Sequence, residues 1–292
     1  MNGILEQLIN GVRTGSIYAL IALGYTMVYG IAKMINFAHG DVIMVGAYSL
    51  YVLIVLCNLP AIVAILITMT ICASLGVLME KIAYKPLRKA PPLSVLITAI
   101  GMSFFLQNLA LLIFKATPIP FGAIINTPSV SIAGFNISGM TIVTLVVTTI
   151  SMILLTLYIH KTKGGRAMRA VSEDQGAAQL MGVDVNGTIS RTFAIGSALA
   201  AVAGILYIAQ YESLSPTMGA LPGIKAFVAA VLGGIGSIPG AMLGGIVLGI
   251  IESMSKAYIS TQLADAIVFG MLVLVLLVKP AGLLGKKKIE KV

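Results

Sequence analysis

The sequence predicts an all-α polytopic membrane protein with about eight transmembrane helices, broken or re-entrant near residues 31–40 and 233–240. Composition is the first observation behind this fold class. Of the 292 residues, 58% are hydrophobic and only 10% are charged, and the mean hydropathy is +1.03. A soluble domain carries about 25% charged residues, so lipid must be the solvent for most of this surface. We expect residues 1–292 to form a single transmembrane domain.

The second observation is a series of apolar stretches that approach or exceed the roughly 20 residues that a helix needs to cross a bilayer. The predicted spans cover residues 8–29, 40–57, 61–83, 93–114, 140–160, 192–210, 225–256 and 262–279. The seventh stretch is too long and too rich in glycine for one helix. We therefore expect a half-helix, a break at GIGSIPG (234–240) and then a full helix. The first stretch is too long for a signal peptide and lacks its basic leader, so we expect it to be retained.

The third observation is the distribution of lysine and arginine, which favour cytoplasmic loops. These residues gather in the loops 84–92 and 161–191 and in the tail from residue 279, whereas 115–139 holds one lysine and 211–224 holds no basic residue. The net charge of +9 thus marks loop positions and not a nucleic-acid surface. We predict an external N-terminus, a cytoplasmic C-terminus and two external segments, 115–139 and 211–224.

The external segment 115–139 is rich in proline, glycine, serine and threonine, and includes Pro118, Pro120 and Pro128. This composition is typical of a surface loop with many turns. The loop is either a simple connector or a landing surface for an extracytoplasmic partner.

The first break, INFAHGDVIM (35–44), interrupts apolar sequence with four chemically distinct residues. We expect Asn36 to cap the helix that follows it directly, with Asp41 in the first turns near the positive end of the helix dipole. His39 offers a hydrogen-bonding group, and Gly40 allows close approach of another backbone. The segment is either a turn with polar caps or the wall or gate of a pathway. In both cases it faces protein or water, because lipid cannot satisfy a broken helix.

The second break lies within LGGIGSIPGAMLGGIVLG (232–249). Gly236, Gly240 and Gly244 recur every four residues, which predicts one face of small residues where backbones approach closely. The face serves either tight packing inside one bundle or a subunit or gating interface.

Ionisable residues inside membrane spans are costly and rarely accidental. They do not form the ordered acid–histidine relay expected of a proton-driven pump. The candidates are Arg13, Asp41, Glu212, Lys225, Glu252 and Asp265.

The loop 161–191 contains a predicted short helix. Ser172 and Gln175 match a capping box with Ser172 as the N-cap. Glu173 and Asp174 then lie in the first turn, where the dipole favours carboxylates.

Gly182 is placed to end this helix after Met181. The helix between the Ser172 cap and Gly182, residues 173–181, is about nine residues long and too short to be stable alone. Ala177, Ala178 and Met181 form a small apolar stripe, so the helix must dock onto the inner surface of its own protein or into a partner.

Three motifs occur in the order found in one transporter family. RAVSEDQGAAQLMGVDV (169–185), MINFAHGDVIMVGAY (34–48) and VLGGIGSIPGAMLGG (231–245) resemble segments of the branched-chain amino acid (high-affinity leucine type) ABC transporter permease family, and the resemblance covers nearly the whole chain. It implies a multi-pass permease of the bacterial cytoplasmic (inner) membrane that serves ATP-driven, binding-protein-dependent import of leucine, isoleucine and valine. The expected partners are a second homologous permease subunit, two cytoplasmic ATPase subunits, an extracytoplasmic solute-binding protein and membrane lipid, and not nucleic acid.

The pathway or gate candidates, which follow from the first break itself, are Asn36, His39, Gly40 and Asp41. The resemblance places the family's coupling helix on Ser172–Met181, so the ATPase-coupling candidates are Ser172, Glu173, Asp174, Ala177, Ala178, Met181 and Gly182.

The chain has no G-x-x-x-x-G-K-[ST] stretch that would cradle nucleotide phosphates, and its two histidines fall in different spans. We therefore expect no catalysis and no cofactor on this chain, with ATP bound by the partner subunits. Two alternatives remain: the same kind of importer for urea, short amides or another small solute, and a stand-alone secondary transporter or channel.

Overall fold

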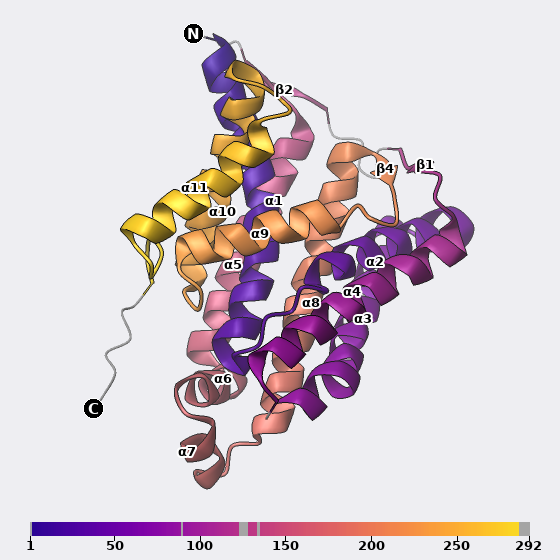
Figure 1. Cartoon of the computed structure of the whole chain (residues 1–292). Coiled ribbons are helices and arrows are strands. Elements are labelled where there is room, and N and C mark those ends of the chain that lie inside the picture. Colours follow the sequence, from indigo (N-terminus) through magenta and orange to yellow (C-terminus); the bar gives the residue numbers. More distant parts are fainter. Residues whose placement is uncertain (1, 89, 123–127, 133–134, 286–292) are drawn as a thin grey trace.

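The computed structural model describes residues 2–88, 90–122, 128–132 and 135–285, and it is almost entirely helical (Figure 1). The long helices are α1 (Asn2–Ala32), α2 (His39–Tyr51), α3 (Ala61–Met79), α4 (Pro92–Phe114), α5 (Gly139–Lys161), α8 (Val185–Tyr211), α9 (Ala220–Gly233), α10 (Ile238–Tyr258) and α11 (Ala264–Val278). The short elements are the π-helices η1 (Val52–Leu56) and η2 (Glu80–Tyr84), the 3₁₀-helix η3 (Lys85–Leu87), α6 (Lys163–Glu173), α7 (Gln175–Leu180), and the strands β1 (Ile119–Pro120), β2 (Val130–Ile132), β3 (Phe135–Ile137) and β4 (Ser213–Leu214).

In the described part of the chain, seven helices are long and apolar enough to cross a membrane. Two shorter apolar helices, α9 and α11, accompany them. The predicted all-α polytopic class with about eight helices is therefore confirmed. The main difference in boundaries is α8, which begins at Val185 and not near residue 192.

Helix α1 forms the centre of the bundle. In the 18-residue apolar stretch of α1 that could cross a membrane, 89% is buried inside the protein, whereas only 17% of the corresponding stretch of α4 is buried. Helix α1 packs against α10, α8, α9 and α5, while α9 lies across the other helices in Figure 1. The peripheral helices α3, α4 and α5 expose large apolar side chains such as Ile62, Leu112 and Leu154, as expected of a surface that faces lipid or another apolar protein.

Glycines allow α1 and α10 to lie in backbone contact. A Cβ added at Gly245 would lie 2.5 Å from Ala19 Cα, and one added at Gly249 would collide with the backbone of Gly15. Such close approach between glycine-bearing faces is a common means of joining membrane helices, because lipid supplies no hydrophobic drive for association.

The second break has the predicted location, between α9 and α10. Gly234 and Gly236 adopt φ angles of +104° and +95°. The Ser237 hydroxyl caps α10 by accepting a hydrogen bond of 3.2 Å from the Gly240 amide.

The predicted face of Gly236, Gly240 and Gly244 is wrong in one member. Gly236 lies in the loop before the helix, and a Cβ added there would meet nothing within 4 Å. Gly240 and Gly244 do face α9, where added Cβ atoms would collide with the carbonyls of Gly233 and Ala229. Four-residue spacing aligns residues only within a continuous helix, which here begins at Ile238. Gly240 and Gly244 therefore serve packing inside the bundle.

The two segments predicted to be external meet in space. Strand β1 of 115–139 pairs with β4 of 211–224, with Ile119 opposite Leu214. The segment 115–139 also contains the hairpin β2–β3, so it is less irregular than its composition indicates. Residues 123–127 and 133–134 of this segment lie outside the described residues.

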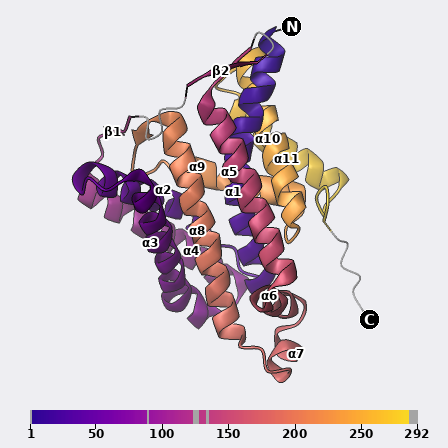
Figure 2. The ribbon, with the colours of Figure 1, turned by 180° about the vertical axis from the view of Figure 1, so that it is seen from behind.

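The two ends of the molecule differ. The N-terminus and the β2–β3 hairpin lie at one end, while α6 and α7 lie at the opposite end (Figures 1 and 2). The predicted orientation is compatible with this arrangement and stays a prediction. Most of the basic tail, from residue 286, lies outside the described residues.

The contact between α1 and α10 leads to a first prediction. Gly249→Ala should lower the free energy of unfolding by about 1–3 kcal/mol, the usual penalty for overpacking, because the added methyl group collides with backbone atoms that cannot rotate away. Thermal unfolding in detergent, followed by the helical circular dichroism signal, measures the effect.

The matched control is Gly101→Ala in α4, where an added Cβ meets nothing within 4 Å. This substitution should leave the midpoint unchanged or raise it slightly, because alanine is favoured over glycine inside a helix by roughly 0.5–1 kcal/mol. Equal midpoints for the two variants would show that α1 and α10 are not in backbone contact.

Candidate functional site

The first break is a non-helical linker, residues 33–38, between α1 and α2. Asn36 of this linker and His39 and Asp41 in the first turn of α2 are buried, with exposed fractions of 2%, 1% and 1%, whereas Lys33 of the linker is exposed. The expectation that this segment faces protein or water and not lipid is therefore confirmed for the three buried side chains.

Asn36 does not cap a helix, contrary to the sequence prediction. Helix α2 begins at His39, its N-cap position is Ala38, and no side chain caps it. The Asn36 side chain instead accepts a hydrogen bond from the Tyr84 hydroxyl, with 2.7 Å between Oδ1 and the phenolic oxygen. The Asn36 oxygen that would accept a local backbone amide in a cap thus accepts the hydroxyl of Tyr84, a residue distant in sequence.

His39 packs edge-on against the ring of Tyr25, with 4.7 Å between ring centroids. Its Nε2 atom has no hydrogen-bond partner among the described residues. It also lies where a Cβ on Gly24 would be, so the ring fills a gap that only glycine leaves in α1.

Gly40 marks the crossing of α2 with α9. A Cβ added at Gly40 would lie 2.6 Å from the carbonyl oxygen of Gly219 and 3.1 Å from Gly223 Cα. The predicted close backbone approach is thus confirmed, and the approaching backbone is that of α9.

Asp41 lies in the first turn of α2, as predicted. Its Oδ1 accepts a hydrogen bond of 2.9 Å from Gln107 of α4. Gln107 in turn lies 3.2 Å from the hydroxyl of Ser103. The carboxylate therefore ties α2 to α4, an arrangement that the sequence did not indicate.

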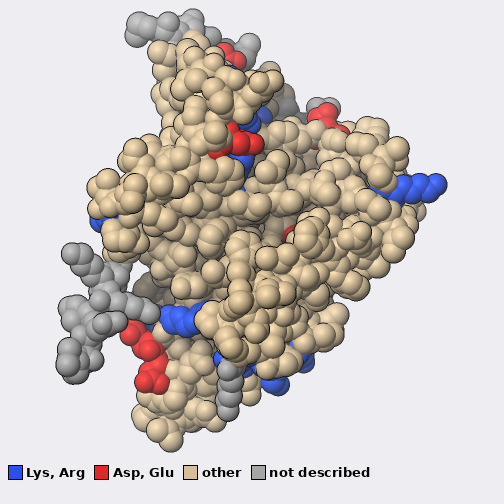
Figure 3. Space-filling model, viewed as in Figure 1, with Lys and Arg blue, Asp and Glu red and all other residues tan. Residues whose placement is uncertain are grey.

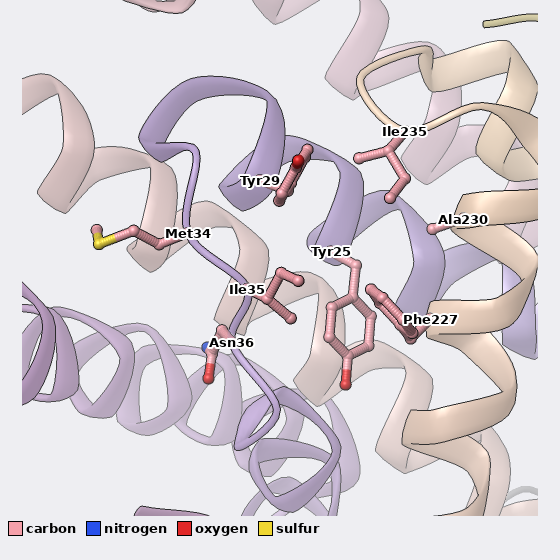
Figure 4. A pocket seen from close by; sticks show the side chains of 8 residues that line it. All are labelled: Tyr25, Tyr29, Met34, Ile35, Asn36, Phe227, Ala230 and Ile235. Atoms are coloured by element: carbon pink, nitrogen blue, oxygen red, sulfur yellow. The ribbon is translucent and has the colours of Figure 1, made fainter. Parts of the chain in front are cut away.

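A pocket forms where the two breaks meet (Figure 4). Its cavity volume is ≈ 10 Å³, about the space that one water molecule needs, and its lining residues are Tyr25, Tyr29, Met34, Ile35, Asn36, Phe227, Ala230 and Ile235. Met34 to Asn36 belong to the first break, and Ile235 belongs to the second. Of the four pathway candidates only Asn36 lines this pocket, whereas His39, Gly40 and Asp41 are packed behind it.

The pocket walls are mostly apolar and aromatic. The ring centroids of Tyr25 and Phe227 lie 5.8 Å apart, and in Figure 4 both rings point into the space beside Ile35. Apolar walls with few polar groups are typical of small-molecule sites, but such sites enclose roughly 300–1,000 Å³. The pocket is therefore closed to a solute in this structure.

Three of the predicted intramembrane ionisable residues meet in one ion cluster. Lys225 Nζ of α9 lies 2.9 Å from Glu252 Oε1 of α10 and 2.6 Å from Asp265 Oδ1 of α11. Lys256 Nζ lies 2.6 Å from the same Glu252 oxygen, and the Tyr18 hydroxyl donates to the other at 2.8 Å. The ion cluster joins four helices around one buried carboxylate.

The other ionisable candidates lie outside this ion cluster. Glu212 ends α8 in the left-handed conformation, with φ 49°, and Arg13 lies on α1. A second pocket beside the ion cluster is lined by Gln7, Thr14, Tyr211, Glu252, Ser253 and Lys256. Charged side chains are otherwise sparse on the face in Figure 3.

The short helix of the loop 161–191 differs from its prediction at the N-terminus. Ser172 lies within α6, where its hydroxyl donates to the Arg169 carbonyl at 2.7 Å. Asp174 is the N-cap of α7 instead, and its Oδ1 accepts the Ala177 amide at 2.9 Å. The reason is tertiary: Met168 and Val171 are each 1% exposed, and their burial keeps α6 helical as far as Glu173, so Ser172 cannot take the extended backbone that a cap needs.

The C-terminus of α7 follows the prediction, because Gly182 adopts φ +82° and its amide bonds the Gln179 carbonyl at 3.0 Å. The predicted apolar stripe of Ala177, Ala178 and Met181 is wrong in one member, because Ala178 is 4% exposed and packs inward. Ala177 and Met181 are exposed, and Leu180, which was not predicted, is 90% exposed beside Met181, itself 84% exposed. The free apolar tip of α7 is therefore Leu180 with Met181.

Sequence reasoning missed a second polar cluster at the α6–α7 end of the molecule. Glu80 is fully buried, pairs with Arg88 and accepts the Ser190 hydroxyl at 2.6 Å. A signal was present, because Glu80 is a carboxylate inside the predicted span 61–83. Its partners could not be read from the sequence.

The chain resembles known transport proteins over nearly its whole length. The family profile described as "Branched-chain amino acid transport system / permease component" matches residues 7–276. The high-affinity branched-chain amino acid transport system permease protein BraD of Pseudomonas aeruginosa is 47% identical over 302 residues, covering 99% of this chain and 98% of that protein.

Two permeases of Escherichia coli are also similar to the chain, one named for the same high-affinity system and one, at lower identity, for another solute. The permease protein LivH of Escherichia coli strain K12, named for the same high-affinity system, is 45% identical over 300 residues, covering 99% of this chain and 97% of that protein. The ribose import permease protein RbsC of the same organism is 25% identical over 259 residues, covering 85% of this chain and 77% of that protein. No solved structure matches the chain.

The ion cluster around Glu252 leads to a second prediction. Lys225→Met should lower the free energy of unfolding by roughly 3 kcal/mol, near the lower end for breaking a buried ion pair, because Lys256 and Tyr18 remain to compensate Glu252. Thermal unfolding in detergent measures the loss.

The control is Asp265→Asn, since that carboxylate is 45% exposed and exposed pairs contribute about 0–1 kcal/mol. If Lys225→Met is no more harmful than Asp265→Asn, the ion cluster does not hold α9 in place.

Proposed function

Since the chain belongs to the family of permease components of branched-chain amino acid ABC transport systems, we propose that it serves ATP-driven, binding-protein-dependent import of leucine, isoleucine and valine. The observation that carries the proposal is the similarity over 99% of the chain to permeases named for this high-affinity system. The chain acts as a transport subunit and not as an enzyme in itself.

The geometry supports a solute pathway at the meeting point of the two breaks. Broken helices are tolerated at membrane depth where they are buried in protein or line a cavity, and both breaks here contribute to one pocket. Its aromatic and aliphatic walls suit a branched aliphatic side chain, which can enter only when the two breaks move apart, because the present space is ≈ 10 Å³. Asn36 supplies a polar group among the lining residues, as solute orientation requires.

The proposed energy source lies on other polypeptides. The sequence lacks a phosphate-binding G-x-x-x-x-G-K-[ST] loop, so we assign nucleotide binding to two cytoplasmic ATPase subunits. A second homologous permease subunit and an extracytoplasmic solute-binding protein complete the proposed assembly, which lies in the bacterial cytoplasmic membrane.

Helix α7 is the proposed contact with an ATPase. It lies at one end of the molecule, far from the N-terminus (Figure 2), and it presents Leu180 and Met181 to solvent. A short helix with an apolar tip fits the helix-in-groove form of recognition. This contact requires the α7 end to face the cytoplasm, as the basic loop 161–191 predicts.

A second candidate function is import of another small solute by the same kind of assembly. It is favoured by the more distant similarity to a permease named for ribose import. Urea and short amides remain candidates of the same class, and a stand-alone secondary transporter is the alternative outside it.

The apolar tip of α7 yields a third prediction. The double substitution Leu180→Asp with Met181→Asp should leave folding intact, because both side chains are exposed, but should release the ATPase subunits. Burying a carboxylate in an apolar groove without a partner is strongly unfavourable. Co-purification of the ATPases with the permease measures the effect.

Gln179→Ala is the matched control, since Gln179 is an exposed polar residue of the same helix. This variant should retain the ATPases. Normal ATPase recovery with the double aspartate variant would mean that α7 is not the docking element.

A fourth prediction tests the proposed function directly. Proteoliposomes that contain this chain, the second permease and the ATPases should accumulate radiolabelled leucine only when ATP and the binding protein are both supplied. The chain by itself should accumulate none under a proton gradient. Accumulation by the chain alone would establish the secondary-transporter alternative.

Parallel vesicles supplied with labelled urea, acetamide or ribose separate the solute alternatives. Leucine should be taken up at least tenfold faster than these solutes. A reversed preference would retain the ATP-driven importer and overturn its assignment to branched-chain amino acids.

A further inference from the structure

Helix α7 and the pocket at the two breaks lie in different parts of the molecule. If an ATPase acts on α7, its movement must reach the linker 33–38 through the elements between them. Among the described residues, a set of polar contacts joins these elements. It begins at the chain connection from α7 to α8.

The connection between α7 and α8 is short and internally bonded. The Val183 amide bonds the Ala178 carbonyl at 3.0 Å, and Asp184 caps α8 by accepting the Gly187 amide at 3.0 Å. A displacement of α7 is therefore passed to the first turn of α8, because no loose segment intervenes.

The first two turns of α8 are hydrogen-bonded to the residues that follow α3. Asn186 and Ser190 are four residues apart and share one face of α8. Asn186 accepts a hydrogen bond from Arg88, Arg88 pairs with Glu80, and Ser190 donates to the second oxygen of Glu80 at 2.6 Å. Because Glu80 is fully buried, these are strong contacts with a charge that has no access to water.

The π-helix η2 carries the contacts onward to the linker. Glu80 is its first residue and Tyr84 its last. Tyr84 is also fully buried, its ring lies 5.3 Å from that of Phe193 on α8, and its hydroxyl donates to Asn36 at 2.7 Å. Asn36 lines the pocket, so the contacts end at the proposed pathway.

The two helices that carry this set are in close contact elsewhere. A Cβ added at Gly76 of α3 would collide with the hydroxyl of Ser197 and lie 2.8 Å from the Phe193 carbonyl. α3 and α8 can therefore move together without a gap opening between them. Single-turn π segments such as η2 are often found at functional sites.

We propose that Glu80, Tyr84, Arg88, Asn186 and Ser190 form a clamp that transmits movement of α7 to Asn36 and so to the linker that walls the pocket. The inference rests on the proposed function, because it supplies the internal link that an ATP-driven permease requires. The five clamp residues are positioning residues, since they act through Asn36 and the linker and do not themselves line the pocket.

The clamp has a consequence that a purely structural cluster does not have. When the link is weakened, binding-protein-stimulated ATP hydrolysis should continue while leucine transport falls. The ratio of leucine transported to ATP hydrolysed should therefore decrease. A cluster that only stabilises the fold would lower the amount of complex and leave this ratio unchanged.

The test uses the complete assembly in proteoliposomes, with Tyr84→Phe and Ser190→Ala as the principal variants. Each removes one hydroxyl group and leaves a side chain of similar shape. Each should lower the transport ratio about two- to tenfold, measured per assembled complex so that a loss of stability or yield does not enter the ratio. The matched control, Tyr158→Phe, removes a tyrosine hydroxyl from α5 at the same end of the molecule and should keep the wild-type ratio.

A double-mutant cycle then tests the final contact. Tyr84→Phe combined with Asn36→Ala should be no worse than Asn36→Ala alone, because both changes remove the same hydrogen bond. Additive losses in the transport ratio would mean that Tyr84 acts independently of Asn36 and would overturn the link.

The remaining outcomes separate the clamp from the proposed function. If the wild-type assembly shows no ATP-dependent leucine uptake, the proposed function fails before any variant is compared. If the wild type transports and both variants keep its ratio, at normal or at reduced yield, the clamp is overturned and the proposed function stands.

Discussion

The constraint on which the structure depends is that lipid cannot hydrogen-bond a peptide group. Each helix break at membrane depth must therefore be enclosed by protein. The linker 33–38 is enclosed by η2 and α9, with Asn36 bonded to Tyr84. At the second break, the last carbonyls of α9 would lack partners, but the amides of Leu283 and Leu284 bond Leu232 and Gly233 at 2.8 and 2.9 Å. The two breaks lie side by side, and the pocket is the space left between Met34 to Asn36 of the first and Ile235 of the second.

The same constraint governs the buried charges. Glu252 is met by Lys225 and Tyr18 from other helices and by Lys256 of its own helix, whereas Glu80 is met by Arg88 and by the Ser190 hydroxyl of α8. A buried carboxylate with several partners tolerates little displacement, because losing one partner leaves charge uncompensated. The ion cluster around Glu252 therefore fixes α9 against α1, α10 and α11, while Glu80 fixes α3 against α8. The polar groups at both ends of the bundle thus define which helices form rigid units.

Rigid units around two breaks suit the proposed transport function. Glycine contacts hold α1 and α10 together, and the short polar linkers are the parts of the core without continuous helical hydrogen bonds. A displacement of α7 would move the rigid helices as units. Bending would occur at residues 33–38, where the backbone lacks helical hydrogen bonds and its torsion angles can change. Membrane transporters commonly move rigid repeats or bundles around a central site. In this chain we propose that α3 and α8 move as rigid helices and that the linker 33–38 changes its conformation.

The sequence by itself determined the features that depend on local chemistry. Apolar length predicted the spans, glycine and polar residues predicted both breaks, and Gly182 predicted the end of α7, because hydrophobicity and backbone freedom act on a residue and its near neighbours. Only the tertiary structure decided which polar groups meet. Asn36 accepts a hydrogen bond from Tyr84 in place of a local amide. Asp174, and not Ser172, caps α7, because the burial of Val171 keeps Ser172 within α6. Glu80 accepts a hydrogen bond from Ser190, which lies more than a hundred residues further along the chain. Local rules name the groups that need partners, but the packing of distant helices sets the distances, and the distances select the partner.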